Sequence, residues 1–227
     1  MAKCIRTLTV FYDTEISNKE IPFFRGAVLK SCGDKANVLY HNHTGEETFR
    51  YSYPLIQYKR LNGRAAITCV EEGIDLVGQL LSDFYGIINL GQRETECRVM
   101  KVQSAKDLIQ VTDTSVVYNL HQWLPLNAKN YELYQSTDDL VEKIRILERV
   151  LIGNILSFLK GVGIHVEEQL VVHITDIISQ KVITYKDVKL MAFDIKFKAN
   201  INLPIYIGIG KNASIGNGVL VKNSVAG

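Results

Sequence analysis

The order of strand-like and helical segments in the first part of the chain constrains its fold more than any other feature. A β-branched and aromatic alternation at residues 5–12 is followed by helical spacing to Gly33, strands at 49–61 and 65–70, a helix at 73–84 and a short apolar strand at 87–90. The two middle strands flank Asn62-Gly63, a dipeptide that favours a tight hairpin turn. The order β, α, β, β, α, β is typical of the ferredoxin-like arrangement. We therefore expect a ferredoxin-like domain at residues 1–92.

The remaining residues, 93–227, predict a second domain with antiparallel strands and one dominant helix. The helix is expected from Asp138 to Lys160, because large apolar residues recur there at intervals of three and four, and Gly161 and Gly163 follow it. Strands are expected at residues 96–102, 108–120, 170–178, 182–185, 189–199 and 219–222. The fold class is therefore α+β, with tandem ferredoxin-like (RRM-like) domains and a glycine-rich loop near the C-terminus.

Composition excludes several classes of protein. The chain has 227 residues, 47% of them hydrophobic, and a net charge of only +2, so it can bury a core and is not globally basic. The four cysteines (Cys4, Cys32, Cys69, Cys97) form no CxxC pair, which favours reduced core residues over a metal centre or disulfides. The longest uncharged apolar run is too short to span a bilayer. We expect a cytoplasmic protein without cofactor, metal or membrane partner.

A glycine-rich segment near the C-terminus predicts an anion-binding loop. It runs from Pro204 to Leu220 and carries Lys211 and Ser214 among its glycines. Glycine allows backbone N–H groups to converge on a phosphate where a Cβ would intrude. The alternative is a turn that only joins strands. Candidate binding residues in this segment are Gly208, Gly210, Lys211, Asn212, Ser214, Gly216, Asn217 and Gly218.

Two histidines separated by one residue form the strongest candidate for catalysis. In an extended segment, His41 and His43 point to the same side, about 7 Å apart. Imidazoles titrate near neutral pH and can act as base and acid. Tyr51, Tyr53 and Lys59 would add donors able to stabilise a charged phosphorane. The alternatives are a solvated loop or a metal site, and the latter lacks a convincing ligand set.

Aromatic and basic residues also alternate from Tyr51 to Arg60, a pattern suited to stacking on unpaired bases and binding phosphates with Lys59 and Arg60. An ordinary strand with mixed faces gives the same pattern. The other histidines, His121, His165 and His173, are interpreted as packed or surface residues without a role.

The last residues also contain three hexads that begin at Ile209, Ile215 and Val221, similar to the left-handed β-helix of hexapeptide acyltransferases. Such helices need many stacked repeats to bury a core, and this chain has none elsewhere. An acyltransferase is therefore disfavoured.

Several sequence blocks together resemble a CRISPR-associated repeat-processing endoribonuclease of the RAMP superfamily. The blocks are Glu20-Ile-Pro-Phe-Phe-Arg-Gly-Ala-Val, Tyr40-His-Asn-His, Tyr53-Pro-Leu-Ile-Gln-Tyr-Lys, Leu151-Ile-Gly-Asn-Ile-Leu-Ser-Phe and the glycine-rich segment from Leu203. They span nearly the whole chain in the order that the family shows. One departure is Asn217, which stands between glycines where the family commonly has an aromatic residue. This puts a stacking role there in doubt.

The resemblance implies tandem ferredoxin-like domains, RNA binding by the glycine-rich loop and metal-independent cleavage of CRISPR repeat RNA in the precursor transcript. The implied reaction is attack by a 2′-hydroxyl, which leaves a 2′,3′-cyclic phosphate and a 5′-hydroxyl. In that reaction we expect His43 to be the general base and His41 its partner acid or orienting group, with Tyr51 or Tyr53 and Lys59 stabilising the transition state. Subunits of a CRISPR interference complex and a homodimer are possible partners. The rival interpretation is a noncatalytic RNA-binding RAMP subunit.

Overall fold

The computed structural model describes residues 2–31, 53–83, 86–185 and 187–222, and it divides into two compact units. The N-terminal unit consists of Ile5–Lys106 together with Ser214–Gly216. The C-terminal unit consists of Met1–Cys4, Asp107–Ala213 and Asn217–Gly227. The chain therefore returns to its first unit for three residues near its end.

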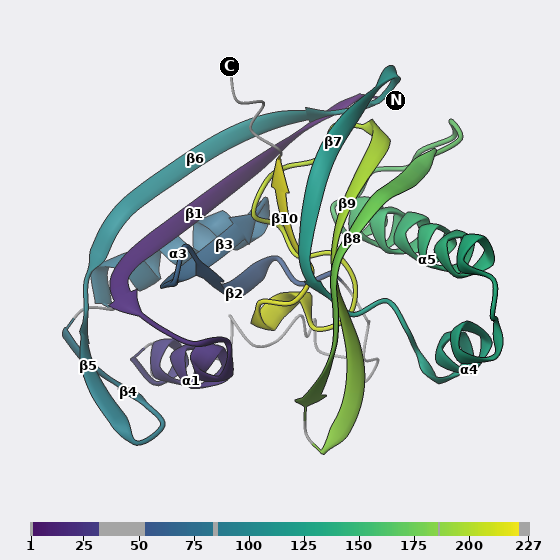
Figure 1. The fold of residues 1–227 in the computed structure, drawn as a ribbon. Helices are drawn as coiled ribbons and strands as arrows, with labels where there is room; N and C mark the ends of the chain where they lie inside the picture. The colour runs from purple at the N-terminus through teal and green to yellow at the C-terminus, as the bar shows by residue number, and fades with distance from the viewer. Residues whose placement is uncertain (1, 32–52, 84–85, 186, 223–227) are drawn as a thin grey trace, which may run out of the picture. The chain divides into compact units, whose positions relative to one another are not determined.

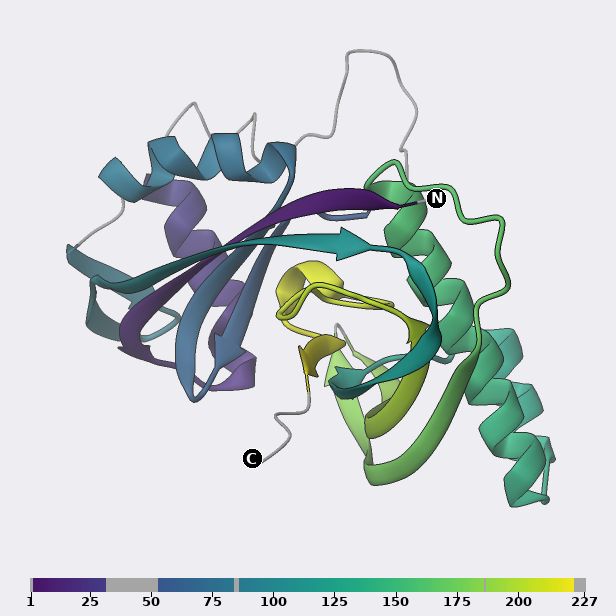
Figure 2. The same ribbon diagram turned by 90° about the horizontal axis from the view of Figure 1, so that it is seen from above.

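The N-terminal unit contains an antiparallel sheet in the order β2-β3-β1-β6 and a separate two-stranded sheet of β4 and β5. In Figure 2, α1 and α3 lie on the same face of the larger sheet. The elements are β1 (Lys3–Glu15), the 3-10 turn η1 (Asn18–Glu20), α1 (Ile21–Ser31), β2 (Ile56–Leu61), β3 (Arg64–Val70), α3 (Glu72–Asp83), β4 (Gly86–Leu90), β5 (Arg93–Cys97) and β6 (Val99–Ile109).

Local sequence signals account for the turns of this unit. Asn62 and Gly63 both have positive φ, at 50° and 84°, and join β2 to β3 as the dipeptide predicts. The entry to α1 is fixed by Ser17 and Glu20, because the backbone N–H and the hydroxyl of Ser17 both donate to Oε2 of Glu20 at 2.8 Å. Phe24 of α1 then packs edge-on against Tyr12 and Tyr58, with ring centroids 5.5 and 6.1 Å apart.

The division between the units differs from the boundary expected at residue 92. The apolar segment 87–90 was expected to complete the first sheet, but as β4 it pairs with β5 in a hairpin. The position beside β1 is taken by β6. The continuous part of the N-terminal unit therefore extends to Lys106.

The sheet of the C-terminal unit has the strand order β10-β7-β9-β8, with all three pairs antiparallel. Read in the same direction, the larger N-terminal sheet is β6-β1-β3-β2, so in both units the order is fourth, first, third and second strand, as in a ferredoxin-like fold. Helix α5 lies beside β8 (Figure 1). The elements are β7 (Val111–Trp123), α4 (Ala128–Ser136), α5 (Leu140–Gly161), β8 (Val172–Tyr185), β9 (Val188–Ile201), the 3-10 turn η3 (Ala213–Ile215) and β10 (Val219–Lys222).

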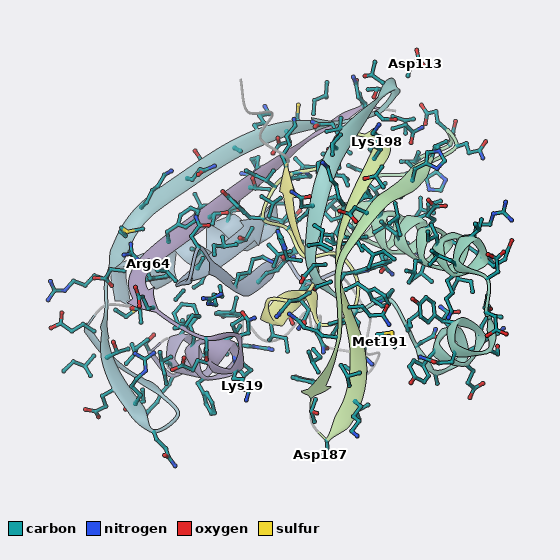
Figure 3. The ribbon with its side chains drawn as sticks, in the orientation of Figure 1. Lys19, Arg64, Asp113, Asp187, Met191 and Lys198 are labelled. Atoms are coloured by element: carbon teal, nitrogen blue, oxygen red, sulfur yellow. The ribbon has the colours of Figure 1, made fainter. Side chains whose placement is uncertain are left out.

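Two features of this unit were not expected from the sequence. Helix α4 occupies chain for which no helix or strand was predicted, and its N-terminus is capped by Asn127, whose Oδ1 accepts from the N–H of Asn130 at 2.8 Å. Strand β8 runs unbroken through residues 179–181, where a gap was expected. It forms a long hairpin with β9, and Figure 3 labels Asp187 at its tip, where φ is +62°.

The core of the C-terminal unit is formed by the apolar stripe of α5 against the sheet. The helix ends where expected, and Gly163 follows with φ of +70°. Completely buried residues of α5 and β9 include Leu147, Leu151, Ile155, Phe158, Phe193, Ile195 and Phe197.

The cysteines follow the expected core pattern only in part. Cys69 and Cys97 are buried, whereas Cys4 is exposed rather than part of a core. Cys32 lies outside the described residues. Among the described helices, none is long and apolar enough to cross a membrane.

Candidate nucleic-acid interface

The glycine-rich loop, residues 202–218, occupies the place between β9 and β10 where a ferredoxin-like unit has its second helix. Its start is held by the phenol of Tyr118 in β7. This hydroxyl donates to the carbonyl of Ile201 at 3.2 Å and accepts from the N–H of Leu203 at 2.8 Å. Burial raises the pKa of Tyr118 to about 12, so the hydroxyl keeps its proton at neutral pH.

The loop closes on itself where Ile209 meets Gly218. The N–H of Ile209 donates to the carbonyl of Gly218 at 2.7 Å, and the N–H of Gly218 donates to the carbonyl of Gln122 at 3.1 Å. A Cβ at Gly218, where φ is +63°, would lie 1.8 Å from the carbonyl oxygen of Ile209. Only glycine fits there, and the reason is packing within the protein.

The turn at Gly210 lies directly on a hydrogen bond between two core elements. The indole N–H of Trp123, the last residue of β7, donates to Oδ1 of Asn154 in α5 at 2.9 Å. A Cβ at Gly210 would lie 2.8 Å from that oxygen and 3.0 Å from the indole nitrogen. Gly210 also has φ of +91°, so both its conformation and its surroundings require glycine.

The donors that the loop leaves available follow Gly210. In the described part of the chain, the backbone N–H groups of Gly210 and Lys211 have no acceptor, and the Lys211 side chain is exposed without an ion pair. Two successive N–H groups beside a cation form a site suited to an anion. Asn212, with φ of +59°, completes this turn, and its buried Nδ2 also lacks a partner among the described residues.

Three residues of the loop, Ser214–Gly216, belong to the N-terminal unit, where Gly216 lies against β2 and the start of α1. A Cβ at Gly216 would lie 2.5 Å from Cδ1 of Ile21, 3.5 Å from the carbonyl oxygen of Tyr58 and 3.7 Å from Cα of Lys59. The structure thus brings Gly216, a predicted RNA-binding residue, next to the strand that carries Lys59 and Arg60.

Two family models match this chain, one for each half. The model of the Cas6b N-terminal domain matches residues 3–107, and the model of the Cas6b C-terminal domain matches residues 110–223. The chain belongs to the Cas6b family. The resemblance to CRISPR-associated RNA-processing proteins is therefore confirmed.

Solved structures of Cas6b proteins agree with this assignment. One described as the crystal structure of Cas6b is 27% identical, has a TM-score of 0.83, and the match covers 97% of this chain and 100% of that one. Another, described as the CRISPR RNA processing endoribonuclease Cas6b, is also 27% identical with a TM-score of 0.73 and the same coverage. An uncharacterised protein of Methanocaldococcus jannaschii is 31% identical over 142 residues, which is 60% of this chain and 95% of that protein.

Some residues predicted for catalysis in this Cas6b chain can be placed, and others cannot. His41, His43 and Tyr51 lie outside the described residues. Tyr53 is 9% exposed, and its hydroxyl accepts from Nε2 of Gln57 at 2.7 Å. Arg60 is exposed, and its Nε donates to the carbonyl of Ile16 at 2.6 Å, which leaves the terminal nitrogens of the guanidinium to contact a phosphate.

Lys59 is placed in the interior of this Cas6b chain. Strand alternation puts its side chain on the same face of β2 as Gln57, opposite to Tyr58, which meets α1. The side chain is 0% exposed, and its Nζ has no hydrogen-bond partner in the described chain. Burial lowers the pKa of Lys59 to about 7. This burial argues against the direct contact with RNA that the sequence suggested for Lys59.

The remaining histidines of the Cas6b chain are surface residues, as expected. The side chain of His121 is 50% exposed, and its Nδ1 lies 3.8 Å from Oδ1 of Asp194. The side chain of His173 is 67% exposed, and its Nδ1 lies 3.8 Å from Oε1 of Glu148. His165 is also exposed. Within the described ranges, no cluster of three or more histidine, cysteine or acidic residues could hold a metal ion.

Trp123 and Asn154 are the site residues that sequence reasoning did not single out. Asn154 lies in the block Leu151-Ile-Gly-Asn-Ile, which carried part of the family resemblance but was given no role. Trp123 is the only tryptophan of the sequence. Because the N–H of a buried indole needs a hydrogen-bond acceptor, a polar residue on a facing helix or strand was the signal that could have pointed to this pair.

Proposed function

We propose that this Cas6b chain is an endoribonuclease that cuts CRISPR repeat RNA in the precursor transcript and releases mature guide RNAs. The observation that carries the proposal is the match of both halves to Cas6b domain models, together with the likeness to a solved structure described as a CRISPR RNA processing endoribonuclease. Repeat RNA is the proposed partner, and the cut needs no metal.

The proposed reaction uses imidazole chemistry. His43 removes the proton of the 2′-hydroxyl, whose oxygen attacks the adjacent phosphorus. The bond from phosphorus to the 5′-oxygen breaks, and His41 gives a proton to that oxygen or orients the donor. The products are a 2′,3′-cyclic phosphate and a 5′-hydroxyl. Tyr51 or Tyr53 donates a hydrogen bond to the phosphorane, a contribution of a few kcal/mol when well aimed.

Binding is assigned to the glycine-rich loop and to β2. Lys211 and the N–H groups of Gly210 and Lys211 are the donors without an acceptor in the described chain, and a phosphate supplies one. Arg60 adds an exposed guanidinium on β2. The other glycines of the loop serve its internal packing, so their contribution to RNA binding is indirect.

The proposal is tested by cutting repeat RNA in excess EDTA, with a matched RNA that carries one 2′-deoxy sugar at the cut nucleotide. Cleavage in chelator that stops with the deoxy sugar supports the proposal. RNA that is bound but left intact in both arms, and also after Mg²⁺ is restored, supports the rival, a noncatalytic RNA-binding subunit. Cleavage of the deoxy substrate rules out attack by the 2′-hydroxyl.

The role of His43 is tested with His43→Ala and a matched control, His121→Ala. His43→Ala is expected to abolish cutting and to keep the affinity for RNA within a few fold, because the base acts on the reacting hydroxyl and not on the phosphate contacts. The control removes an exposed imidazole without a proposed role and keeps full activity. Full activity in His43→Ala would place the base elsewhere.

Partners and location complete the proposal. The guide RNA passes to subunits of a CRISPR interference complex, the protein acts in the cytoplasm, and a homodimer is the proposed assembly. Light scattering during size-exclusion chromatography, with and without repeat RNA, measures whether the protein is a monomer or a dimer. A monomer at all concentrations used for cleavage would refute the dimer.

A further inference from the structure

We propose that Trp123 and Asn154 form a positioning pair that holds the turn at residues 210–212 in the geometry that binds RNA phosphate. The inference rests on the proposed RNA-binding function of this turn. Neither side chain needs to touch the RNA. The pair acts through Gly210, the residue that begins the turn.

The turn at Gly210 lies directly against the hydrogen bond that joins Trp123 and Asn154. The bond from the indole N–H of Trp123 to Oδ1 of Asn154 is 2.9 Å long. The position of a Cβ on Gly210 is 2.8 Å from the oxygen and 3.0 Å from the nitrogen of that same bond. Because a Cβ at Gly210 would clash with both atoms, the glycine backbone itself lies directly against this hydrogen bond, and we infer that the bond sets the position of the turn.

Both members of the pair come from rigid elements. Trp123 is 0% exposed at the end of β7 and packs against Phe193, with ring centroids 6.3 Å apart. Asn154 lies on α5 beside Ile155, which is fully buried. A polar bond fixed to two core elements is a more precise support than a loop could provide.

The same end of β7 also holds the other side of the loop. The carbonyl of Gln122 accepts from the N–H of Gly218 at 3.1 Å, and the N–H of Gln122 donates to Oδ1 of Asp194 at 2.7 Å. Residues 122 and 123 therefore support both ends of the chain from Gly210 to Gly218. Loss of the bond between Trp123 and Asn154 would free one end while the other stays fixed.

The first experiment needs no variant, because Trp123 is the only tryptophan and reports on the turn directly. Repeat RNA with a 2′-deoxy sugar at the cut site is titrated into the full chain while tryptophan emission is recorded. The emission is expected to change and to saturate at the Kd that the anisotropy of labelled RNA gives. Saturation of binding with unchanged emission would overturn the inference.

The second experiment compares Asn154→Leu, Trp123→Phe and the double variant. Each single change removes one partner of the bond, so each is expected to weaken RNA binding roughly tenfold. The turnover number at saturating RNA is expected to stay within a few fold, because the pair does not act on the reacting atoms. The double variant should lose no more than the single ones, as for residues that act as one unit.

Gly153→Ala is the matched control, since it changes the neighbouring residue of α5 and its new Cβ would meet nothing within 4 Å. It should bind RNA as the wild type does. Folded Asn154→Leu and Trp123→Phe proteins with wild-type affinity, or losses that multiply in the double variant, would refute the pair. Wild-type protein that binds RNA without cutting it refutes the proposed activity, and the binding measurements still test the inference.

Discussion

At the scale of single residues, Lys59 is an ionisable group whose side chain is completely removed from water. A lysine side chain that is completely buried without an acceptor destabilises the fold as long as it is charged. Its neighbours on the same sheet face include Gln57 and Thr68, yet Gln57 donates to Tyr53 and Thr68 is within hydrogen-bond distance of Thr9. The ammonium is therefore left without compensation in the described chain.

We predict that Lys59→Met stabilises the protein at pH 7, and that the gain shrinks as the pH rises. The folded-state pKa of Lys59, about 7, lies below the ordinary lysine value of 10.5, so the unfolded chain holds more protons between these values. Wild-type stability then rises with pH across that window, whereas the penalty is complete below it. The expected gain at pH 7 is on the order of 3–5 kcal/mol.

Chemical denaturation at pH 7 and pH 10 measures the effect of Lys59→Met on the free energy of unfolding. Lys198→Met, a change at an exposed lysine of β9 that Figure 3 labels, is the control and should alter stability little at either pH. A Lys59→Met protein less stable than the wild type at pH 7 would mean that the ammonium has a favourable partner.

At the scale of secondary-structure elements, the start of α1 depends on one carboxylate. Glu20 accepts from the backbone N–H and hydroxyl of Ser17 and pairs with Arg93 of β5 at 2.9 Å. The hydrogen bonds from Ser17, with a further contribution from Arg93, lower the pKa of Glu20 below its ordinary value of 4.5. The carboxylate therefore stabilises the fold above that pH, and the contribution is lost as the pH falls through the folded-state pKa.

We predict that Glu20→Gln lowers the stability at pH 7 by about 1 kcal/mol, because an amide keeps the shape but loses the charge. Below the pKa of the wild-type carboxyl group the two proteins should unfold alike. Thermal melts recorded as the pH is lowered stepwise from 7 measure the difference and show where it disappears. Glu94→Gln, at an exposed residue of the same strand as Arg93, should show none. Equal melting of the Glu20→Gln and wild-type proteins at pH 7 would show that the charge contributes nothing.

The elements that sequence predicted well are those set by local chemistry. Asn62-Gly63 fixes a hairpin through its own φ angles, and Gly163 ends α5 in the same way. The predictions that differed depend on distant partners. Gly91, with φ of +75°, permits the hairpin of 87–90 with β5, but nothing local tells that β6 takes the place beside β1. Helix α4 has little apolar periodicity, with Tyr134 as its buried residue.

The candidate site also combines features that the local sequence predicts with features that depend on distant residues. The glycine-rich segment lies between β9 and β10, and Lys211 is exposed. The reason for each glycine could not be predicted, because Gly210 and Gly218 are required by contacts with Asn154 and Ile209. Lys59 was assigned to the site as a cationic donor, and the sequence does not tell that both faces of β2 are covered at residues 57–59.

At the scale of the whole molecule, the two units are not simple consecutive halves. Lys3, near the N-terminus, donates from Nζ to the carbonyl of Val162 at 2.9 Å and so belongs to the C-terminal unit. Ser214–Gly216, near the other end, belongs to the N-terminal unit. Each unit therefore takes a short piece of chain from beyond its main segment, and we expect a fragment cut at any single position to lose stabilising contacts.

We predict a graded loss of stability from the full chain to fragment 1–106 and then to fragment 1–92. Of the N-terminal unit, fragment 1–106 lacks the end of β6 and Ser214–Gly216, which lies against Ile21 and the backbone of β2, so it should still melt cooperatively. Fragment 1–92 also lacks β5 and all of β6, which leaves β1 as an open edge and removes the hydrogen bonds from Thr14 to Glu96 and from Asp13 to Arg98. It should aggregate or melt without a transition, as circular dichroism and size-exclusion chromatography would show. Equal melting of the two fragments would mean that β5 and β6 are both dispensable and that the unit ends near residue 92, because strands that contribute no stability cannot define the limit of a domain.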